Sequence, residues 1–236
     1  MKIVIWNCNM AFRKKAEFIL GENPDIVVVP ESECPEKLSF SKGLRLPNDV
    51  FWYGDNPNKG IGVYSYSDFK ITLSKIHNPE FRYLIPLIVK NNDIEFTLLA
   101  VWCQRPKDSN NYGTNTWNAI HYYSKLLKNK KVILAGDFNS SSIWDRPNRA
   151  ANHTNIVNKL KDVGIESAYH VFNNESQGQE SCATLFMQRK LDKGYHIDFC
   201  FASGCFIKKL KSVSIGEHKS WCKLSDHMPI VCEFED

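Results

Sequence analysis

The chain has 236 residues, of which 24% are charged and 43% belong to the hydrophobic set, as in an ordinary globular protein. No apolar run approaches the roughly 20 residues of a membrane helix, and the start, MKIVIWNCNM, has no signal-peptide pattern, so we expect neither a membrane protein nor a secreted one. The net charge of +4 permits a polyanionic partner without requiring one.

The chain contains eight cysteines, and none of them forms a C-x-x-C pair. Most lie in apolar stretches, which favours reduced cysteines in a cytoplasmic protein over a disulfide framework or a zinc site. No repeat, low-complexity tract or linker divides the sequence. We therefore expect a single domain over residues 1–236, acting as a monomer.

The N-terminal quarter predicts strand, helix and strand. Residues 2–9 are apolar on both faces until their polar end, which indicates a strand covered on both sides. Residues 12–20 show helical spacing of apolar side chains, with Gly21 as an expected C-terminal cap. Residues 25–30, DIVVVP, form the next predicted buried strand, and Glu31 stands at its end.

The middle of the chain predicts several short strands and a hairpin. The short strands are Phe51–Tyr53, Gly60–Ser65 and Ile71–Leu73. Tyr83–Lys90 and Ile94–Cys103 are predicted to form the hairpin. A polar loop, Gln104–Asn115, then leads into a helix whose apolar positions run from Trp117 to Leu127 and which ends in the lysines before the next strand.

The stretch KVILAGDFNSS, which starts at Lys131, combines a buried strand with polar side chains at its end. Its apolar run is followed by Ala135 and Gly136, where the backbone or a ligand can come close. Asp137 and Asn139 are two residues apart, so they point to the same face of an extended chain. A carboxylate there can hold a metal or take a proton, and a strand that ends in an Asx turn explains the stretch equally well on its own.

The C-terminal part predicts one more helix, over residues 156–163, which stops at Gly164. The last clear strands are Cys182–Met187, Tyr195–Ala202 and Pro229–Phe234. Strands buried on both faces, short hairpins and a few helices predict an α/β fold in which two packed sheets carry helices on the outside.

Polar residues recur where these apolar strands end. They are Asn7, Asn9, Glu31, Asp137, Asn139, Asp198, Asp226 and His227. Asp198 lies between Ile197 and Phe199, and a carboxylate in such a place is costly unless it has a partner or a metal. A structural salt bridge would explain one such residue, but eight of them at strand ends indicate a functional site.

Five short motifs, WNCNM, PE at Pro30-Glu31, GDFN, HIDF and SDHMPI, resemble the ordered motif set of the endonuclease/exonuclease/phosphatase superfamily. Its members include exonuclease III-like abasic-site nucleases, pancreatic-type deoxyribonucleases, sphingomyelinases and inositol polyphosphate phosphatases. The resemblance runs over nearly the whole chain, and it implies a four-layer α/β/β/α sandwich of two mixed sheets. The site is then expected at one edge of the two facing sheets.

The resemblance implies a divalent metal site. Family members bind the metal through the residue at the Glu31 position, with help from the Asn9 and Asp226 positions. Mg²⁺ or Mn²⁺ suits such oxygen ligands and would keep several waters and a phosphate oxygen of the substrate.

The resemblance also implies the roles of the remaining motif residues. The Asp137 position orients or deprotonates the attacking water, and Asn139 and Asn7 hydrogen-bond the phosphate. His227 contacts the scissile phosphate or acts as the base, while Asp198 fixes the tautomer of His227.

Other residues near the motifs are candidates for substrate binding: Arg146, Arg149, Tyr112 and Trp102. A solvated surface is the alternative for the two arginines. The His or Tyr that many family members carry past the middle strand is missing at Val101–Cys103. The motif typical of abasic-site nucleases keeps only its aromatic residue near Tyr169, which argues against specificity for abasic sites.

Together these features predict a Mg²⁺- or Mn²⁺-dependent phosphodiesterase that cleaves DNA or RNA by in-line attack of water. We expect unpaired nucleic acid to be cut better than an intact duplex. The alternatives are a phosphatase or phospholipase that acts on a small or lipid phosphoester, and a catalytically inactive binding protein on the same fold.

Overall fold

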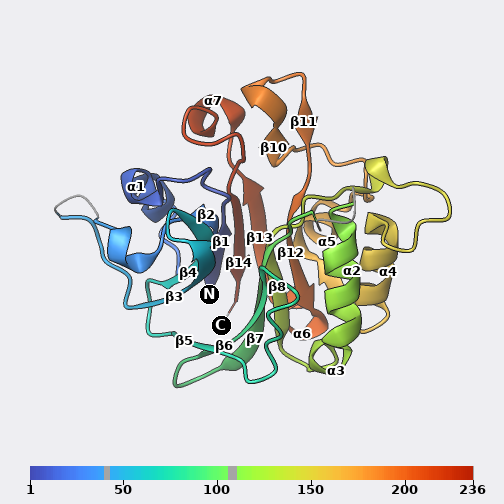
Figure 1. The fold of residues 1–236 in the computed structure, drawn as a ribbon, viewed down its shortest axis with the longest axis horizontal. Coiled ribbons are helices and arrows are strands. Elements are labelled where there is room, and N and C mark those ends of the chain that lie inside the picture. The colour runs from blue at the N-terminus through green and yellow to red at the C-terminus, as the bar shows by residue number, and fades with distance from the viewer. Residues whose placement is uncertain (40–42, 106–110, 236) are drawn as a thin grey trace.

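Two mixed β-sheets lie face to face in the computed structural model, which describes residues 1–39, 43–105 and 111–235 (Figure 1). In spatial order, the first six-stranded sheet contains β13 (Leu210–Ile215), β14 (Ile230–Phe234), β1 (Lys2–Ile5), β2 (Ile26–Ser32), β4 (Lys59–Ser65) and β3 (Asp49–Asn56). The second contains β5 (Lys70–Leu73), β6 (Leu84–Lys90), β7 (Glu95–Trp102), β8 (Val132–Asp137), β12 (Asp198–Ser203) and β9 (Ile165–Ser167). A two-stranded sheet pairs β10 (Leu185–Phe186) with β11 (Gly194–Tyr195).

Helices cover the outer faces of the two large sheets, which gives the expected four layers (Figure 1). On the outer faces lie α1 (Ala16–Leu20), α2 (Gly113–Tyr122), α3 (Ser124–Leu127), α4 (His153–Lys161) and α7 (His218–Trp221). In contrast, α5 (Ala168–Asn173) and α6 (Gly204–Ile207) contribute Ala168, Tyr169 and Phe206 to the core between the sheets. Short 3₁₀ turns occupy Phe12–Lys14, Pro35–Lys37, Ser142–Trp144 and Met187–Arg189. Within the described ranges, every helix is too short or too polar to cross a membrane.

The central strands are buried on both faces, as their apolar runs predict. Leu98 packs into the core between the two sheets, whereas its neighbour Leu99 packs into the core beneath α2 and α4. In the first sheet Val28 faces the other sheet, and Val27 faces the layer that contains Ile19 of α1. Because successive side chains of a strand point to opposite faces, such strands need cover on both sides.

Several predicted elements are shorter or divided in the structure. The helix expected over residues 12–20 is a 3₁₀ turn followed by α1, and Gly21 has a right-handed φ of −58° in place of a left-handed cap. The helix expected from Trp117 into the lysines after Leu127 is broken at Tyr123, whose hydroxyl accepts a hydrogen bond from the Asn78 backbone. The loop expected at Gln104–Asn115 contains residues 106–110, which lie outside the described residues, and α2 already begins at Gly113.

The C-terminal strand predictions were also too long. The strand expected at Cys182–Met187 is reduced to the two residues of β10, because only these pair with β11. The strand expected at Tyr195–Ala202 starts as a ladder only at Asp198. Strand β13, whose residues are mostly half-buried, was missed because it lies at a sheet edge and has no continuous apolar run.

Gly136 is the residue before Asp137, the polar residue at the end of β8, and it lets β8 approach β7 closely. Its φ of +146° is unfavourable for other residues, and a Cβ atom there would lie 1.8 Å from the carbonyl oxygen of Val101. The next residue, Asp137, is paired with Trp102 of β7 and with Asp198 of β12. The close approach at Gly136 therefore helps to set the position of Asp137 between β7 and β12.

We predict that Gly136→Ala lowers the free energy of unfolding by more than about 3 kcal/mol, because backbone atoms of β7 would have to move. Chemical denaturation followed by fluorescence measures the change. Gly204→Ala is the matched control, since a Cβ atom at Gly204 meets nothing closer than 3.9 Å. Equal stability of the two variants would contradict the prediction.

Candidate functional site

The polar strand ends of the two sheets meet at one edge of the sandwich. Parallel pairing of β1 with β2 brings the residues after β1 beside Glu31 near the end of β2. In the second sheet, antiparallel pairing places Asp198 directly opposite Asp137. Asp226 and His227 precede β14, which is paired with β1. The topology thus gathers residues from five separate parts of the chain.

The side chain of Asn7 links the two sheets. Its Nδ2 donates to Asp137 Oδ2 at 3.0 Å and to Glu31 Oε1 at 3.3 Å. The backbone carbonyl of Asn7 accepts a hydrogen bond from Ser225 Oγ at 2.8 Å, and Ser225 Oγ in turn accepts one from the His227 N–H at 3.0 Å. One buried amide therefore fixes two carboxylates and, through its own backbone, the loop that carries His227.

The expected contact between Asp198 and His227 is present. His227 Nδ1 lies 2.9 Å from Asp198 Oδ2, and both side chains are buried. Burial on its own lowers the pKa of His227, but the charges of Asp198 and Asp137 and the hydrogen bond to Asp198 outweigh it and raise the pKa to about 10. The ring nitrogen Nδ1 therefore carries a proton that it donates to Asp198.

The carboxylate of Asp137 is held by several hydrogen bonds. It accepts one from the backbone N–H of Asn139 at 2.8 Å and one from Asn139 Nδ2 at 3.0 Å, in addition to the bond from Asn7. Burial and the nearby charge of Asp198 raise the pKa of Asp137 to about 7, although His227 and the hydrogen bond from Asn7 act in the opposite direction.

The two asparagine amides next to Asp137 have no N–H left over in this arrangement. Asn7 uses both of its amide donors on carboxylates, and Asn139 donates to Asp137 and to the Cys103 carbonyl, the latter at 3.0 Å. As the structure stands, both side chains orient Asp137. A direct bond from either amide to a phosphate would require one of these partners to be exchanged.

Three site residues have left-handed backbone conformations. Asn9 has a φ of 50°, Glu31 a φ of 65° and Asn139 a φ of 48°. At Glu31 the pairing register of β2 with β4 shifts between Pro30 and Ser32, so the residue lies in a β-bulge that redirects its side chain. Non-glycine residues in such conformations cost about 1–3 kcal/mol each, and they concentrate at functional sites.

Lys59 is a member of the site that the sequence motifs did not indicate. Its Nζ lies 3.1 Å from Glu31 Oε2 and 5.4 Å from the ring centre of Trp102. Lys59 is the first residue of β4, and Gly60 pairs with Ser32 just past the bulge. Lys59 could have been found from the sequence only by predicting how β2 pairs with β4 across this bulge.

Two sets of donors in the site can accept a divalent cation. Asn9 Nδ2 donates to Asp226 Oδ1 at 3.0 Å, and together with Glu31 these residues supply the oxygen ligands that Mg²⁺ prefers. Asp137, Asp198 and His227 form a second set, in which one potential ligand atom of each lies within 4.8 Å of the others. Among the described residues Asp198 Oδ1 is buried without a hydrogen-bond partner, and such an oxygen is suited to coordinate a cation.

The family model for the endonuclease/exonuclease/phosphatase family matches residues 4–227. The chain belongs to this family. A comparison with curated proteins by sequence finds no match.

Solved structures of family members share the fold. A 3′ phosphatase, NExo, from Neisseria, bound to a product DNA hairpin, is 20% identical with a TM-score of 0.69, and the match covers 100% of both chains. An AP endonuclease from Archaeoglobus fulgidus is 17% identical, also with a TM-score of 0.69 and 100% of both chains covered. The catalytic domain of APE2 from Xenopus laevis is 16% identical with a TM-score of 0.67, over 99% of this chain and 91% of the other.

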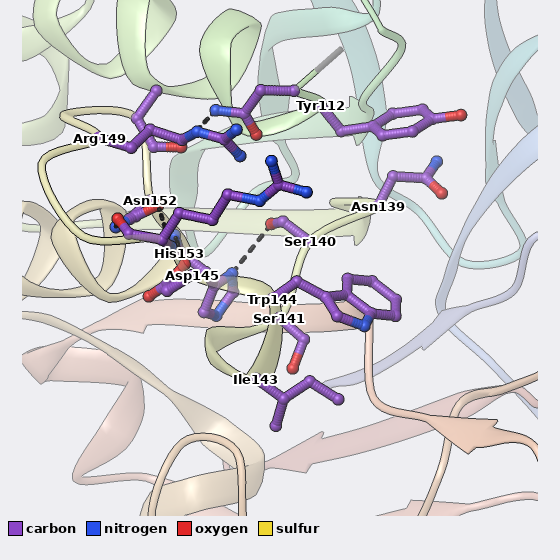
Figure 2. A pocket seen from close by; sticks show the side chains of 13 residues that line it. Tyr112, Asn139, Ser140, Ser141, Ile143, Trp144, Asp145, Arg149, Asn152 and His153 are labelled. Carbon is purple, nitrogen blue, oxygen red and sulfur yellow. Dashed lines mark hydrogen bonds between the residues drawn. The ribbon is translucent and has the colours of Figure 1, made fainter.

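The four predicted substrate-binding residues lie in two places. Trp102 is only 4% exposed and packs against Tyr83, with a ring-centre distance of 4.6 Å, so it belongs to the inter-sheet core. Tyr112, Arg146 and Arg149 line a pocket of about 440 Å³ next to Asn139 (Figure 2). The structure therefore gathers all eight motif residues at one edge and places this pocket beside them.

His153 supports the floor of that pocket from α4. Its Nδ1 lies 2.9 Å from Ser140 Oγ and its Nε2 lies 3.1 Å from Gln177 Oε1, and the ring is buried. Burial lowers the pKa of His153 to about 4, although Gln177 and the charges of Asp145 and Glu180 act to raise it. The neutral ring accepts from the serine hydroxyl and donates to the amide oxygen.

This buried histidine should make stability pH-dependent. Between pH 6.5 and about pH 4 the unfolded state binds a proton that folded His153 does not, so unfolding becomes easier as the pH falls through this range. The loss amounts to about 3 kcal/mol over the window. His153→Gln should remove this component from the pH profile of the unfolding free energy, whereas His121→Gln on the exposed side of α2 should retain it. Parallel profiles for the wild type and His153→Gln would contradict the assignment.

Proposed function

We propose that this protein hydrolyses phosphodiester bonds in nucleic acid with the help of a divalent cation, Mg²⁺ or Mn²⁺. The observation that carries the proposal is the buried Asp198–His227 pair beside Asp137, with one nitrogen or oxygen atom of each within 4.8 Å of the others. A carboxylate and a carboxylate-bound imidazole at this spacing can act on a water and on a phosphate oxygen at the same time. Membership of a family of nucleases and phosphatases supports the same chemistry.

In this proposal Asp137 takes the proton of the attacking water. The hydrogen bonds from Asn7 and Asn139 hold its carboxylate in one orientation, which makes these two amides positioning residues. His227 directs its remaining ring nitrogen to the phosphate and stabilises the charge that develops on a phosphoryl oxygen. Asp198 keeps His227 in the required orientation and offsets its charge.

A bound divalent cation would supply charge neutralisation at the phosphate and the leaving oxygen. Glu31, Asn9 and Asp226 would hold it, since they offer oxygen ligands and lie beside the catalytic group of residues. Lys59 pairs with Glu31 and therefore competes with a cation for the same carboxylate.

A phosphatase that removes a terminal phosphate from nucleic acid is the second candidate. The structural likeness to a 3′ phosphatase bound to a DNA hairpin motivates it. A panel of labelled single-stranded DNA, single-stranded RNA, duplex, duplex with one abasic site and DNA with a 3′-terminal phosphate distinguishes the candidates. Chain cleavage supports the nuclease, whereas release of phosphate from the 3′ end alone supports the phosphatase.

The cation requirement yields one prediction. Activity should vanish in EDTA and return with Mg²⁺ or Mn²⁺, and Mn²⁺ titrated calorimetrically should bind more weakly to Glu31→Gln. Lys59→Met should bind Mn²⁺ about two- to fivefold more tightly, because the half-buried ion pair no longer competes for Glu31. Lys125→Met is the matched control, since α3 leads into the start of β8 and lies far from its end. Full turnover of the metal-free protein in EDTA would refute the cation requirement.

The catalytic assignment yields another. His227→Ala should lower kcat on the best substrate of the panel by on the order of 10²- to 10³-fold, as expected for loss of a group that stabilises charge on a phosphoryl oxygen. His121→Ala, which changes an exposed histidine on α2, should retain wild-type kcat. Thermal unfolding monitored by circular dichroism checks that both variants are folded. A folded His227→Ala variant with wild-type kcat would exclude the proposed role.

A further inference from the structure

The pocket beside Asn139 is formed by the loop between β8 and α4 together with Asn111 and Tyr112, the two residues before α2 (Figure 2). Its volume of about 440 Å³ falls in the range of pockets that hold one small ligand, such as a single nucleotide unit. Asn139 lies on its wall and is hydrogen-bonded to Asp137, so the pocket opens directly next to the catalytic carboxylate. Whatever occupies it is adjacent to the scissile phosphate.

The loop that forms this pocket is held in one shape by side-chain amides. The Asn152 side chain accepts from the Arg146 N–H at 3.2 Å and donates to the Arg146 carbonyl at 2.7 Å. Asn155 Nδ2 donates to the carbonyls of Arg149 and Ala150, and Asn111 Nδ2 donates to that of Ala151 at 2.8 Å. The pocket is therefore preorganised, which reduces the entropy lost when a ligand binds.

The pocket presents positive charge that is not used elsewhere. Arg146 and Arg149 line it, and within residues 1–39, 43–105 and 111–235 neither guanidinium has an ion-pair partner. Asp145 also lines it, but its two carboxylate oxygens accept the backbone N–H groups of His153 and Thr154 at the start of α4. Arg149 is half-buried, and a half-buried arginine without a carboxylate is suited to a phosphate.

Two aromatic rings stand at the mouth of the pocket. Trp144 is 41% exposed and Tyr112 is 40% exposed, whereas Trp6 and Trp102, which also lie next to the motifs, are buried. The Trp144 ring is supported from behind by Tyr195, at a ring-centre distance of 5.0 Å. Exposed rings beside a basic pocket provide the stacking surface on which proteins bind unpaired bases.

We propose that this pocket binds, as an unpaired unit, the nucleotide that flanks the scissile phosphate. Arg149 contacts the phosphate of that nucleotide, and its base lies against Trp144 and Tyr112. The inference rests on the proposed nuclease function and adds the form of the substrate to it. A duplex must give up one base pair to fill the pocket, so single-stranded nucleic acid is the preferred substrate.

The experiment compares kcat/KM for a short single-stranded DNA with kcat/KM for bis(p-nitrophenyl) phosphate, a diester with no flanking nucleotide. The quantity of interest is kcat/KM for the DNA divided by kcat/KM for the diester. Arg149→Gln should lower this ratio about tenfold or more, since a charge-assisted contact to phosphate is lost. The slope of log(kcat/KM) for the DNA against log[KCl] should become shallower by about 0.7, the value for one phosphate contact on a single strand. Trp144→Ala should lower the ratio about tenfold and reduce the preference for single-stranded over duplex DNA.

Lys125→Gln on α3 is the control, because it removes one positive charge far from the pocket and should leave the salt dependence unchanged. Arg149→Lys keeps the charge and should retain the wild-type slope, which separates a phosphate contact from a structural effect. If the salt dependence of kcat/KM has the same slope for Arg149→Gln as for Lys125→Gln, the pocket assignment is overturned but the proposed function is not. A wild-type preference for duplex DNA has the same consequence. Inactivity of the wild type on both the diester and the DNA overturns the proposed function and this inference with it.

Discussion

The hydrogen bonds of one buried amide, that of Asn7, connect the two halves of this protein at its functional edge. The side chain belongs to the first sheet, yet it donates to Asp137 of the second and to Glu31 of its own. The bond to Asp137 requires β8 to keep its pairing register with β7 and β12, because a shift of one residue would turn Asp137 to the opposite face of its sheet. The apolar core between the sheets holds them together, and the Asn7 amide holds Asp137 and Glu31 close to each other at the edge.

The site concentrates conformational cost that the rest of the fold offsets. Three of its residues, Asn9, Glu31 and Asn139, hold left-handed backbone conformations, and Asp198 leaves one carboxylate oxygen without a partner among the described residues. Strands that are apolar on both faces provide the compensating burial immediately behind the site. Such an arrangement favours function over local stability, since relaxing any one of these residues would separate the groups that act together.

The sequence predicted the buried strands and the convergence of the motif residues well, because apolar runs and strand-end polar residues are local signals. Lys59 was missed because its place beside Glu31 depends on a bulge in the pairing of β2 with β4, which no periodicity records. The break at Tyr123 likewise involves a partner distant in the chain, Asn78. The length of β10 depends on its pairing with β11, which no apolar run records. Trp102 was grouped with the substrate-binding candidates because it lies near the motifs, but its burial against Tyr83 follows from tertiary packing alone.

In the loop between β8 and α4, the side chains that hold the backbone in place differ from the two arginines that line the pocket. Its path is maintained by the side chains of Asn111, Asn152 and Asn155 on backbone atoms of residues 146–151, and none of these bonds involves the pocket-lining side chains of Arg146 or Arg149. The side chains at these two positions can therefore change without altering the path of the loop. A family that serves many substrates can diversify at such positions while the catalytic edge stays intact, so this loop is a place where specificity can evolve independently of catalysis.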